Sequence, residues 1–283
     1  MLRSVEAVAA VSEEPIREAS CWPIDIRCKE GDGPEIVIRV KPVNKKKLAG
    51  VAISEAVSWS ILSACGLHVA EAFIVKMSAQ FAADLSVQGG YNPPIRAGRH
   101  WGTRFLREGV GLDEGFSREQ LDQAGQPEHV FRIFLIDELT GNADRLTEGN
   151  LLLVTDPVLP PRLVAIDQSN GFGGPTCICD KKCLDTNHGR RYARSYQVME
   201  QLLMERPPEF VDGELALVEA QRGAILGAVN TPHAEWYDRA EIEADCLAEY
   251  LKARLDGLAV LGQREHWRKI CELGREYEGK LKL

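Results

Sequence analysis

Residues 141–167 constrain the fold most, because a polar loop lies there between an apolar helix and two short apolar strands. The loop contains Asp144 and leads to Asn150, and a second acid, Asp167, follows the apolar run 163–166. An apolar strand would bury the Asp167 carboxylate at a high free-energy cost, which a Mg²⁺ ion would offset. The segment therefore predicts two strands whose ends carry polar, metal-binding side chains.

The polar side chains of this segment match the requirements of phosphoryl transfer. In kinases, an Asp orients or deprotonates the attacking hydroxyl, while an Asn and a second Asp hold the metal ions on the ATP phosphates. Asp144, Asn150 and Asp167 are the candidates for these roles. Five residues separate Asp144 from Asn150, one more than the kinase motif has. The alternative for Asp144 is a turn residue, since Gly-Asn-Ala-Asp is good turn composition.

A kinase also needs a cation for the ATP phosphates, on a strand of its small lobe. Arg39 and Lys41 both qualify, because a side-chain period of two places them on one face of the expected strand 36–41. The following helix should supply an acid that pairs with the cation, and Glu55 stands there among apolar and small residues. Solvent-facing charges on an edge strand and a surface Glu are the alternatives.

The loop that covers the phosphates has no G-x-G-x-x-G pattern in this chain. The candidate is the segment 18–23, between the first two expected strands. Its backbone N–H groups and the hydroxyl of Ser20 would contact phosphate there, as in other anion-binding loops.

The order of expected elements predicts two parts. With 283 residues, the chain can build one large core or two lobes around a cleft. We expect an α+β, protein-kinase-like, two-lobed fold. A small β-rich lobe with one helix and a connector would occupy residues 1–105. A larger, mainly helical lobe would occupy residues 106–283 and would hold the catalytic loop 141–150.

Charge and hydropathy exclude several classes of function. The net charge of −8 and the pI of about 5.4 argue against general binding to nucleic acid or to an anionic membrane surface. Residues 1–6 lack the apolar region of a secretory signal, and no segment is long and apolar enough to span a membrane. We therefore expect a cytoplasmic protein whose cysteines are mostly free thiols.

A cysteine-rich segment follows the second strand. Three thiols and an imidazole lie within twelve residues and would supply a tetrahedral Zn²⁺ site, from Cys177, Cys179, Cys183 and His188. Because the C-x-C start differs from the usual spacing of zinc ligands, free or redox-active thiols are the alternative. A zinc-stabilised interaction module without enzyme activity is the corresponding alternative function.

Taken together, these residues resemble the HipA-like kinases, in particular their compact bacterial branch, and more distantly the type II phosphatidylinositol 4-kinases. The resemblance rests on a strand with Val-Ile-Arg-Val-Lys, a helix with Ser-Glu, a loop with Gly-Asn-Ala-Asp-Arg and a downstream Asn-Leu-Leu, and an Ile-Asp pair. It also includes a connector motif at 99–104 and a C-terminal helical segment that begins near 231–236.

The resemblance implies that Asp144 is the catalytic base, that Asn150 and Asp167 bind Mg²⁺, and that Arg39 or Lys41 binds the ATP phosphates. It further implies that the acceptor hydroxyl belongs to a protein Ser or Thr. A lipid or small-molecule kinase stays open as an alternative, and so does a pseudokinase that binds nucleotide or a partner without turnover. The sequence also leaves room for a regulatory protein partner.

Overall fold

The computed structural model describes most of the chain, in the ranges 2–11, 22–44, 46–106, 109–111, 127–142, 145, 150–154, 161–169, 171–173, 204–237, 240–269 and 272.

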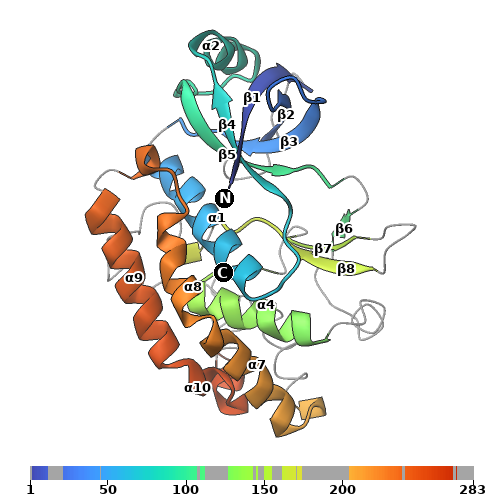
Figure 1. Cartoon of the computed structure of the whole chain (residues 1–283), viewed down its shortest axis with the longest axis vertical. Coiled ribbons are helices and arrows are strands. Elements are labelled where there is room, and N and C mark those ends of the chain that lie inside the picture. The colour runs from blue at the N-terminus through green and yellow to red at the C-terminus, as the bar shows by residue number, and fades with distance from the viewer. Residues whose placement is uncertain are drawn as a thin grey trace, which may run out of the picture.

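Five strands close into a barrel at one end of the molecule, in the order β1–β2–β3–β5–β4 (Figure 1). The strands are β1 Arg3–Ala10, β2 Ile24–Lys29, β3 Ile36–Lys41, β4 Ala72–Met77 and β5 Gly98–Arg104. Neighbouring strands run antiparallel except β1 and β4, which are parallel. The alternation expected for β3 is confirmed, because Ile38 and Val40 are buried in the barrel core while Arg39 and Lys41 face the other way.

The long helix α1, Lys46–Ala64, lies between the barrel and the other helices (Figure 1). Its apolar positions, among them Ile53, Val57 and Ile61, belong to the same core as the later helices. Gly66 has φ +73°, a left-handed conformation that glycine adopts without steric cost and that ends the helix. The apolar face of α1 is therefore anchored in the core of the helical part, while Glu55 on the same helix lines the cavity described below.

The expectation of one helix within residues 1–105 is wrong, because a second helix, α2 Ala79–Gln88, packs on the barrel. Ser78 caps it, since the Ser78 side chain accepts a hydrogen bond from the Phe81 backbone N–H at 3.1 Å. The motif at 99–104, expected in a connector, forms strand β5 instead. Pairing with β3 and β4 makes it a strand, although its sequence does not alternate.

The rest of the described chain combines a small sheet with helices. The sheet has the order β6–β7–β8, from Gly109–Gly111, Leu151–Val154 and Arg162–Ala165, so the expected strand pair within 150–167 is confirmed. The helices are α4 Pro127–Thr140, α7 Pro208–Ala220, α8 Arg222–Gly227, α9 Ala240–Asp256 and α10 Leu258–Leu261. Short 3₁₀ turns are η1 Gly171–Gly173, η3 Ala228–Asn230 and η4 Ala234–Trp236.

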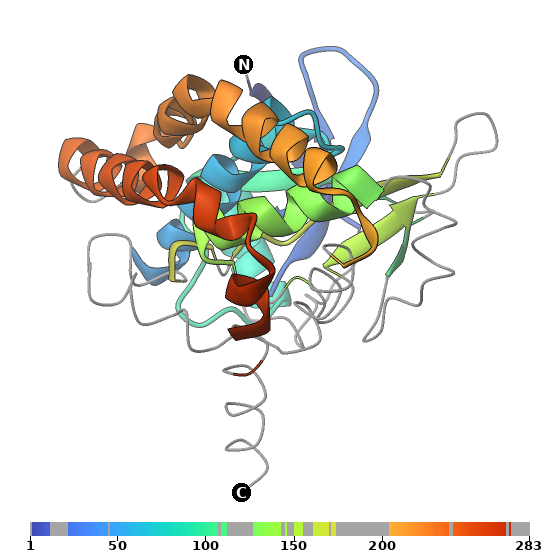
Figure 2. The same cartoon turned by 90° about the horizontal axis from the view of Figure 1, so that it is seen from below.

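Helix α4 is central to the helical part. It contacts α1, α7 and α9, and Figure 2 shows these helices side by side. Trp236 and Trp267 are buried in the same core. None of the helices in the described ranges is long and apolar enough to cross a bilayer.

Candidate active site

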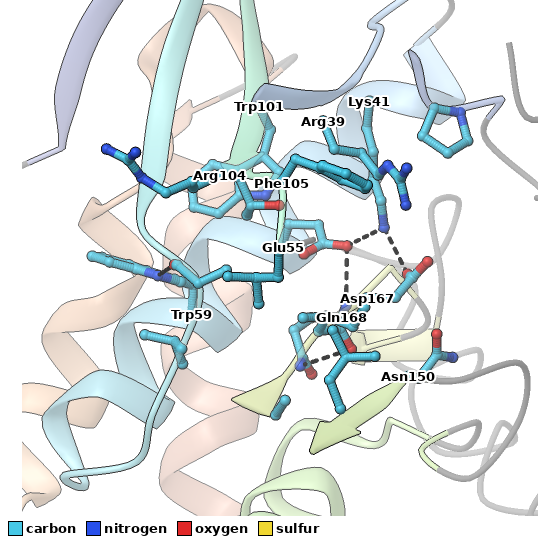
Figure 3. Close-up of a pocket in the computed structure, with 18 of the residues that line it drawn as sticks. Arg39, Lys41, Glu55, Trp59, Trp101, Arg104, Phe105, Asn150, Asp167 and Gln168 are labelled. Atoms are coloured by element: carbon cyan, nitrogen blue, oxygen red, sulfur yellow. Dashed lines mark hydrogen bonds and ion pairs between the residues drawn. The ribbon is translucent and has the colours of Figure 1, made fainter. Parts of the chain in front are cut away.

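A cavity of about 430 Å³ lies between the barrel and the β7–β8 pair (Figure 3). It contains every candidate site residue that the structure describes, namely Arg39, Lys41, Glu55, Asn150 and Asp167. These residues come from β3, from α1 and from the ends of β7 and β8, so the fold brings together segments that are far apart in the sequence.

Lys41 lies at the polar end of this cavity. Its Nζ pairs with Glu55 Oε1 and lies 2.7 Å from Asp167 Oδ1 (Figure 3). The side chains of Lys41 and Glu55 are only 12% and 5% exposed, so water weakens their ion pair little. The structure thus forms the expected pair between a strand cation and a helix acid, and places Lys41 in it.

Arg39 lines the same cavity but has different partners. Its Nε and Nη2 donate to the two carboxylate oxygens of Asp25 at 2.9 and 3.0 Å. Asp25 is its direct neighbour across the β2–β3 pair. The guanidinium carbon also lies 4.6 Å from the centre of the Phe105 ring. Arg39 is therefore held along the barrel wall, whereas Lys41 reaches the two acids.

The backbone of Asp167 is in the left-handed region, with φ +50°, which residues other than glycine rarely adopt. Its Oδ1 accepts hydrogen bonds from the backbone N–H and the hydroxyl of Ser169. Burial raises the pKa of Asp167, but the charge of Lys41 and the hydrogen bonds from Lys41 and Ser169 outweigh it and lower the pKa to about 2. Asp167 is therefore ionised at neutral pH.

Helix α1 also holds the segment that follows Asp167. The backbone N–H of Gln168 donates to Glu55 Oε1 at 3.0 Å, and Ser54 Oγ donates to the carbonyl of Gly171 at 3.0 Å. Burial raises the pKa of Glu55, whereas the Lys41 charge acts in the opposite direction. The charge on Glu55 is therefore tied to the presence of Lys41.

Asn150 stands at the start of β7, and Figure 3 shows its side chain at the same end of the cavity as Asp167. Its backbone carbonyl accepts a hydrogen bond from the Ile166 N–H at 3.1 Å, and this bond joins the start of β7 to the end of β8. Amide and carboxylate oxygens suit Mg²⁺, so the donor set fits this ion. Within the described ranges, three or more His, Cys, Asp or Glu side chains nowhere gather as a metal site.

Sequence analysis did not predict the buried arginine beside the site. Arg145 is 1% exposed, and its Nε and Nη2 donate to the two carboxylate oxygens of Asp137 on α4 at 2.8 and 2.6 Å. The side-chain amide of Asn142 donates to the same acid at 3.1 Å. The available signal was Asp137 itself, because an acid inside an apolar helix needs a buried cation.

Several predicted residues lie outside the described part of the chain. These are the expected base Asp144, the phosphate-contacting Ser20 and the four expected zinc ligands, Cys177, Cys179, Cys183 and His188. Their roles stay predictions.

Comparison with known proteins gives the fold. No protein-family model and no curated protein matches the chain. Among solved structures, the chain is similar to the crystal structure of a Helicobacter pylori proinflammatory kinase, CtkA, with a TM-score of 0.56 and 14% identity. The match covers 93% of this chain and 98% of that one. Nearly the whole chain therefore shares its fold with a kinase structure, and the cavity that holds Lys41, Glu55 and Asp167 is built on that fold.

Proposed function

We propose that this protein is an ATP- and Mg²⁺-dependent kinase of the HipA-like type, which transfers the γ-phosphate of ATP to a hydroxyl group. The barrel would be the small lobe of a two-lobed fold, and the helical part would be the large lobe. One observation carries the proposal. Lys41 Nζ pairs with Glu55 and lies 2.7 Å from Asp167 at the wall of a cavity large enough for a ligand. The fold shared with a kinase structure supports the same conclusion.

Lys41 is the residue that we assign to the ATP phosphates. Kinases use a strand Lys that an acid from the next helix holds in place, and Glu55 occupies that position. Arg39 is less suitable, because both carboxylate oxygens of Asp25 already accept from its guanidinium. Lys41 would supply a point charge, and the Glu55 ion pair and the Gln168 N–H would keep that charge pointed into the cavity.

Asn150 and Asp167 would hold the metal. Mg²⁺, when bound, supplies positive charge that neutralises the phosphate oxygens. Asp167 is suited to this role because it stays ionised well below neutral pH. Lys41 Nζ lies 2.7 Å from Asp167 Oδ1, so the phosphate-binding cation and the metal-binding carboxylate would act side by side on the same phosphates.

The remaining walls of the cavity are suited to a nucleoside. Leu152, Ile166 and Phe105 line it with apolar and aromatic surface, which can pack against a flat base. Catalysis would rest on positioning and on charge neutralisation, with Asp144 as base by resemblance. A protein Ser or Thr as acceptor, a cytoplasmic location and a regulatory protein partner are parts of this proposal that rest on sequence and resemblance.

Thermal unfolding with ATP, in the presence and absence of Mg²⁺, tests the proposal on wild type, Asp167→Asn and Asp84→Asn. Asp84 is the matched control, an exposed acid on α2 whose side chain contacts Gln80. ATP at about 100 times its Kd adds about 2.7 kcal/mol of stability to the folded state. We expect a metal-dependent increase in Tm that Asp167→Asn abolishes and Asp84→Asn retains.

Transfer of radiolabelled γ-phosphate to protein, followed by mass spectrometry of the modified residues, then tests the chemistry. We expect phosphorylated Ser or Thr with wild type and none with Asp144→Asn, which should still bind ATP. Nucleotide binding without transfer would favour a pseudokinase, as the extra residue between Asp144 and Asn150 allows. Absence of any ATP-dependent change in wild-type Tm would refute the kinase proposal.

A further inference from the structure

The buried Arg145 has partners that the proposed reaction does not explain. Its Nε donates to Asp137 at 2.8 Å, its Nη1 to the carbonyls of Asn150 and Ile166 at 2.8 Å each, and its Nη2 to Asp137 and to Gln168 Oε1 at 2.6 Å each. A guanidinium carries five N–H donors in one rigid plane. These hydrogen bonds therefore use the whole donor set in a single orientation.

Two of the acceptors are backbone groups that flank the proposed cation site. Asn150 is one of the proposed metal ligands, and Ile166 directly precedes the other, Asp167. Because a single nitrogen, Nη1, bonds to both carbonyls, Arg145 acts together with the backbone hydrogen bond from Ile166 to Asn150 to set the distance between the start of β7 and the end of β8. That distance determines how far apart the side chains of Asn150 and Asp167 lie.

The same network reaches the phosphate-binding side of the cavity. The Gln168 side chain accepts from Arg145, while the Gln168 backbone N–H donates to Glu55 at 3.0 Å. Glu55 in turn pairs with Lys41. A continuous line of polar contacts thus runs from Asp137 on α4 to the cation that we assign to the nucleotide.

Stability alone gives little reason for a charge at this place. A buried ion pair contributes little net stability compared with apolar packing of the same volume, because both charges lose their hydration. The planar guanidinium group of an arginine, in contrast, can hold several hydrogen-bond acceptors in fixed positions at once. A buried arginine at this place therefore contributes more to the fixed positions of its acceptors than to the free energy of folding.

We propose that Arg145 is a positioning residue that sets the separation of Asn150 and Asp167, and with it the affinity of the site for a divalent cation bound with nucleotide. The inference rests on the proposed function. Groups that orient metal ligands without touching the metal typically change metal affinity by about 10- to 100-fold when they are replaced. Lysine at this position would keep the positive charge but not the planar set of donors.

The chain offers a matched control in another buried arginine, Arg132, which lies on α4, the helix that also carries the Arg145 partner Asp137. Arg132 is 7% exposed and donates to both carboxylate oxygens of Glu214, at 2.7 and 3.0 Å. It also donates to a backbone carbonyl, that of Cys65, at 2.8 Å. Glu214 and Cys65 do not line the cavity. Arg132 thus reproduces the chemistry of Arg145 without its link to the metal ligands.

The test compares wild type, Arg145→Lys and Arg132→Lys. Calorimetry gives the affinity for ATP with Mg²⁺ and with EDTA, and electron paramagnetic resonance gives the affinity of the ATP-loaded protein for Mn²⁺. We expect Arg145→Lys to weaken Mn²⁺ binding about tenfold or more, and to reduce the gain in ATP affinity that Mg²⁺ confers by a similar factor. Arg132→Lys should keep both values, although each variant is expected to unfold more easily than wild type.

Full retention of the metal-dependent gain in Arg145→Lys would overturn the inference, and so would equal losses in both variants. If wild type binds no ATP, the proposed function itself fails, which is a different result from metal-dependent binding that Arg145→Lys leaves intact. Should Arg145→Lys not fold, Gln168→Met removes one acceptor of Arg145. The same direction of change is expected there, and an unchanged Mn²⁺ affinity would again contradict the positioning role.

Discussion

The two sides of the cavity differ in what they bury. The barrel side, formed by β1–β5 and α2, is filled by apolar side chains, and His100 and Ser86 are its buried polar residues within the described ranges. The helical side, formed by α1, α4, the β7–β8 pair and the later helices, buries acids, amides and arginines next to its apolar core. They include Glu55, Arg132, Asp137, Glu138, Asn142, Arg145 and Gln168.

This difference means that the barrel side contributes mainly to the stability of the fold, whereas the polar network of the helical side mainly fixes the positions of side chains around the cavity. Apolar burial stabilises a fold by about 25 cal/mol per Å² and has no preferred direction. A buried polar network adds little net stability but fixes the positions of its members, provided that each has its partners. Changes in the apolar core of the barrel should therefore lower stability and leave ligand binding intact. Changes in the polar network of the helical side should affect both.

Asp137→Ala should give the largest effect, because it leaves the Arg145 charge buried without its main partner. We expect the free energy of unfolding to fall by about 3–5 kcal/mol, measured by urea denaturation, and metal-dependent ATP binding to be lost. Asp84→Ala on α2 is the control and should change stability little. A loss of less than about 1 kcal/mol for Asp137→Ala would show that the network does not depend on this ion pair.

His100 gives the next largest effect, through pH. Its Nδ1 accepts from the Val43 N–H at 2.9 Å and its Nε2 donates to the Arg96 carbonyl at 3.0 Å, so the folded state holds the neutral ring. Burial lowers the pKa of His100 to about 4, although the hydrogen bond to Arg96 acts in the opposite direction. An unfolded His has a pKa of about 6.5, so between these values the unfolded chain binds more protons than the folded one.

The free energy of unfolding should therefore decrease as the pH falls from about 6.5 to about 4, by about 3 kcal/mol from this group. Urea denaturation at several pH values measures the slope, and His100→Gln is the comparison, because all other titrating groups remain. A variant with the same slope as wild type would mean that His100 is not held neutral.

Gly102→Ala tests the barrel side by overpacking. An added Cβ would lie 2.5 Å from Ile38 Cγ2 and 3.1 Å from Val75 Cγ2, both in the barrel core. We expect a loss of about 1–3 kcal/mol with no change in metal-dependent ATP binding. Gly213→Ala, on α7 with open space around it, should instead stabilise the helix slightly. If Gly102→Ala weakened ATP binding as strongly as it weakened folding, the separation of the two sides would fail.

The smallest effect is expected where the two sides meet at the surface. Arg99 on β5 pairs with Glu235 in η4, with side chains 34% and 53% exposed. Glu235→Gln should change the free energy of unfolding by less than about 1 kcal/mol, because water and salt screen exposed ion pairs. Denaturation at low and high salt measures it. A larger loss, present only at low salt, would show that this contact couples the barrel to the helical side.

The sequence predicted the parts of the site that depend on local periodicity. An alternating strand placed Arg39 and Lys41 on one face, and the structure confirms it. The sequence left the choice between them open, because their partners come from elsewhere. Asp25 lies on the neighbouring strand and Glu55 on the following helix, and only the three-dimensional arrangement assigns one acid to each cation.

Arg145 and β5 show what local patterns leave out. Arginine is almost always exposed, so a loop arginine gives no signal of burial until its acid on another element is known. Strand β5 reads Gly-Arg-His-Trp-Gly-Thr-Arg, without alternation, and it is a strand because β3 and β4 supply hydrogen-bond partners on both sides. In both cases, contacts between distant segments override the local sequence. The expected boundary near residue 105 stays a prediction.

The aromatic wall of the cavity has a practical consequence. Trp59 and Trp101 line the cavity with ring centres 6.2 Å apart, and Trp59 is half-buried. Indole emission moves to shorter wavelength when water leaves the ring, so a compound that fills the cavity changes the intrinsic fluorescence of Trp59. The protein thus carries its own optical reporter, with which unlabelled compounds can be screened, and Trp59→Phe removes that signal.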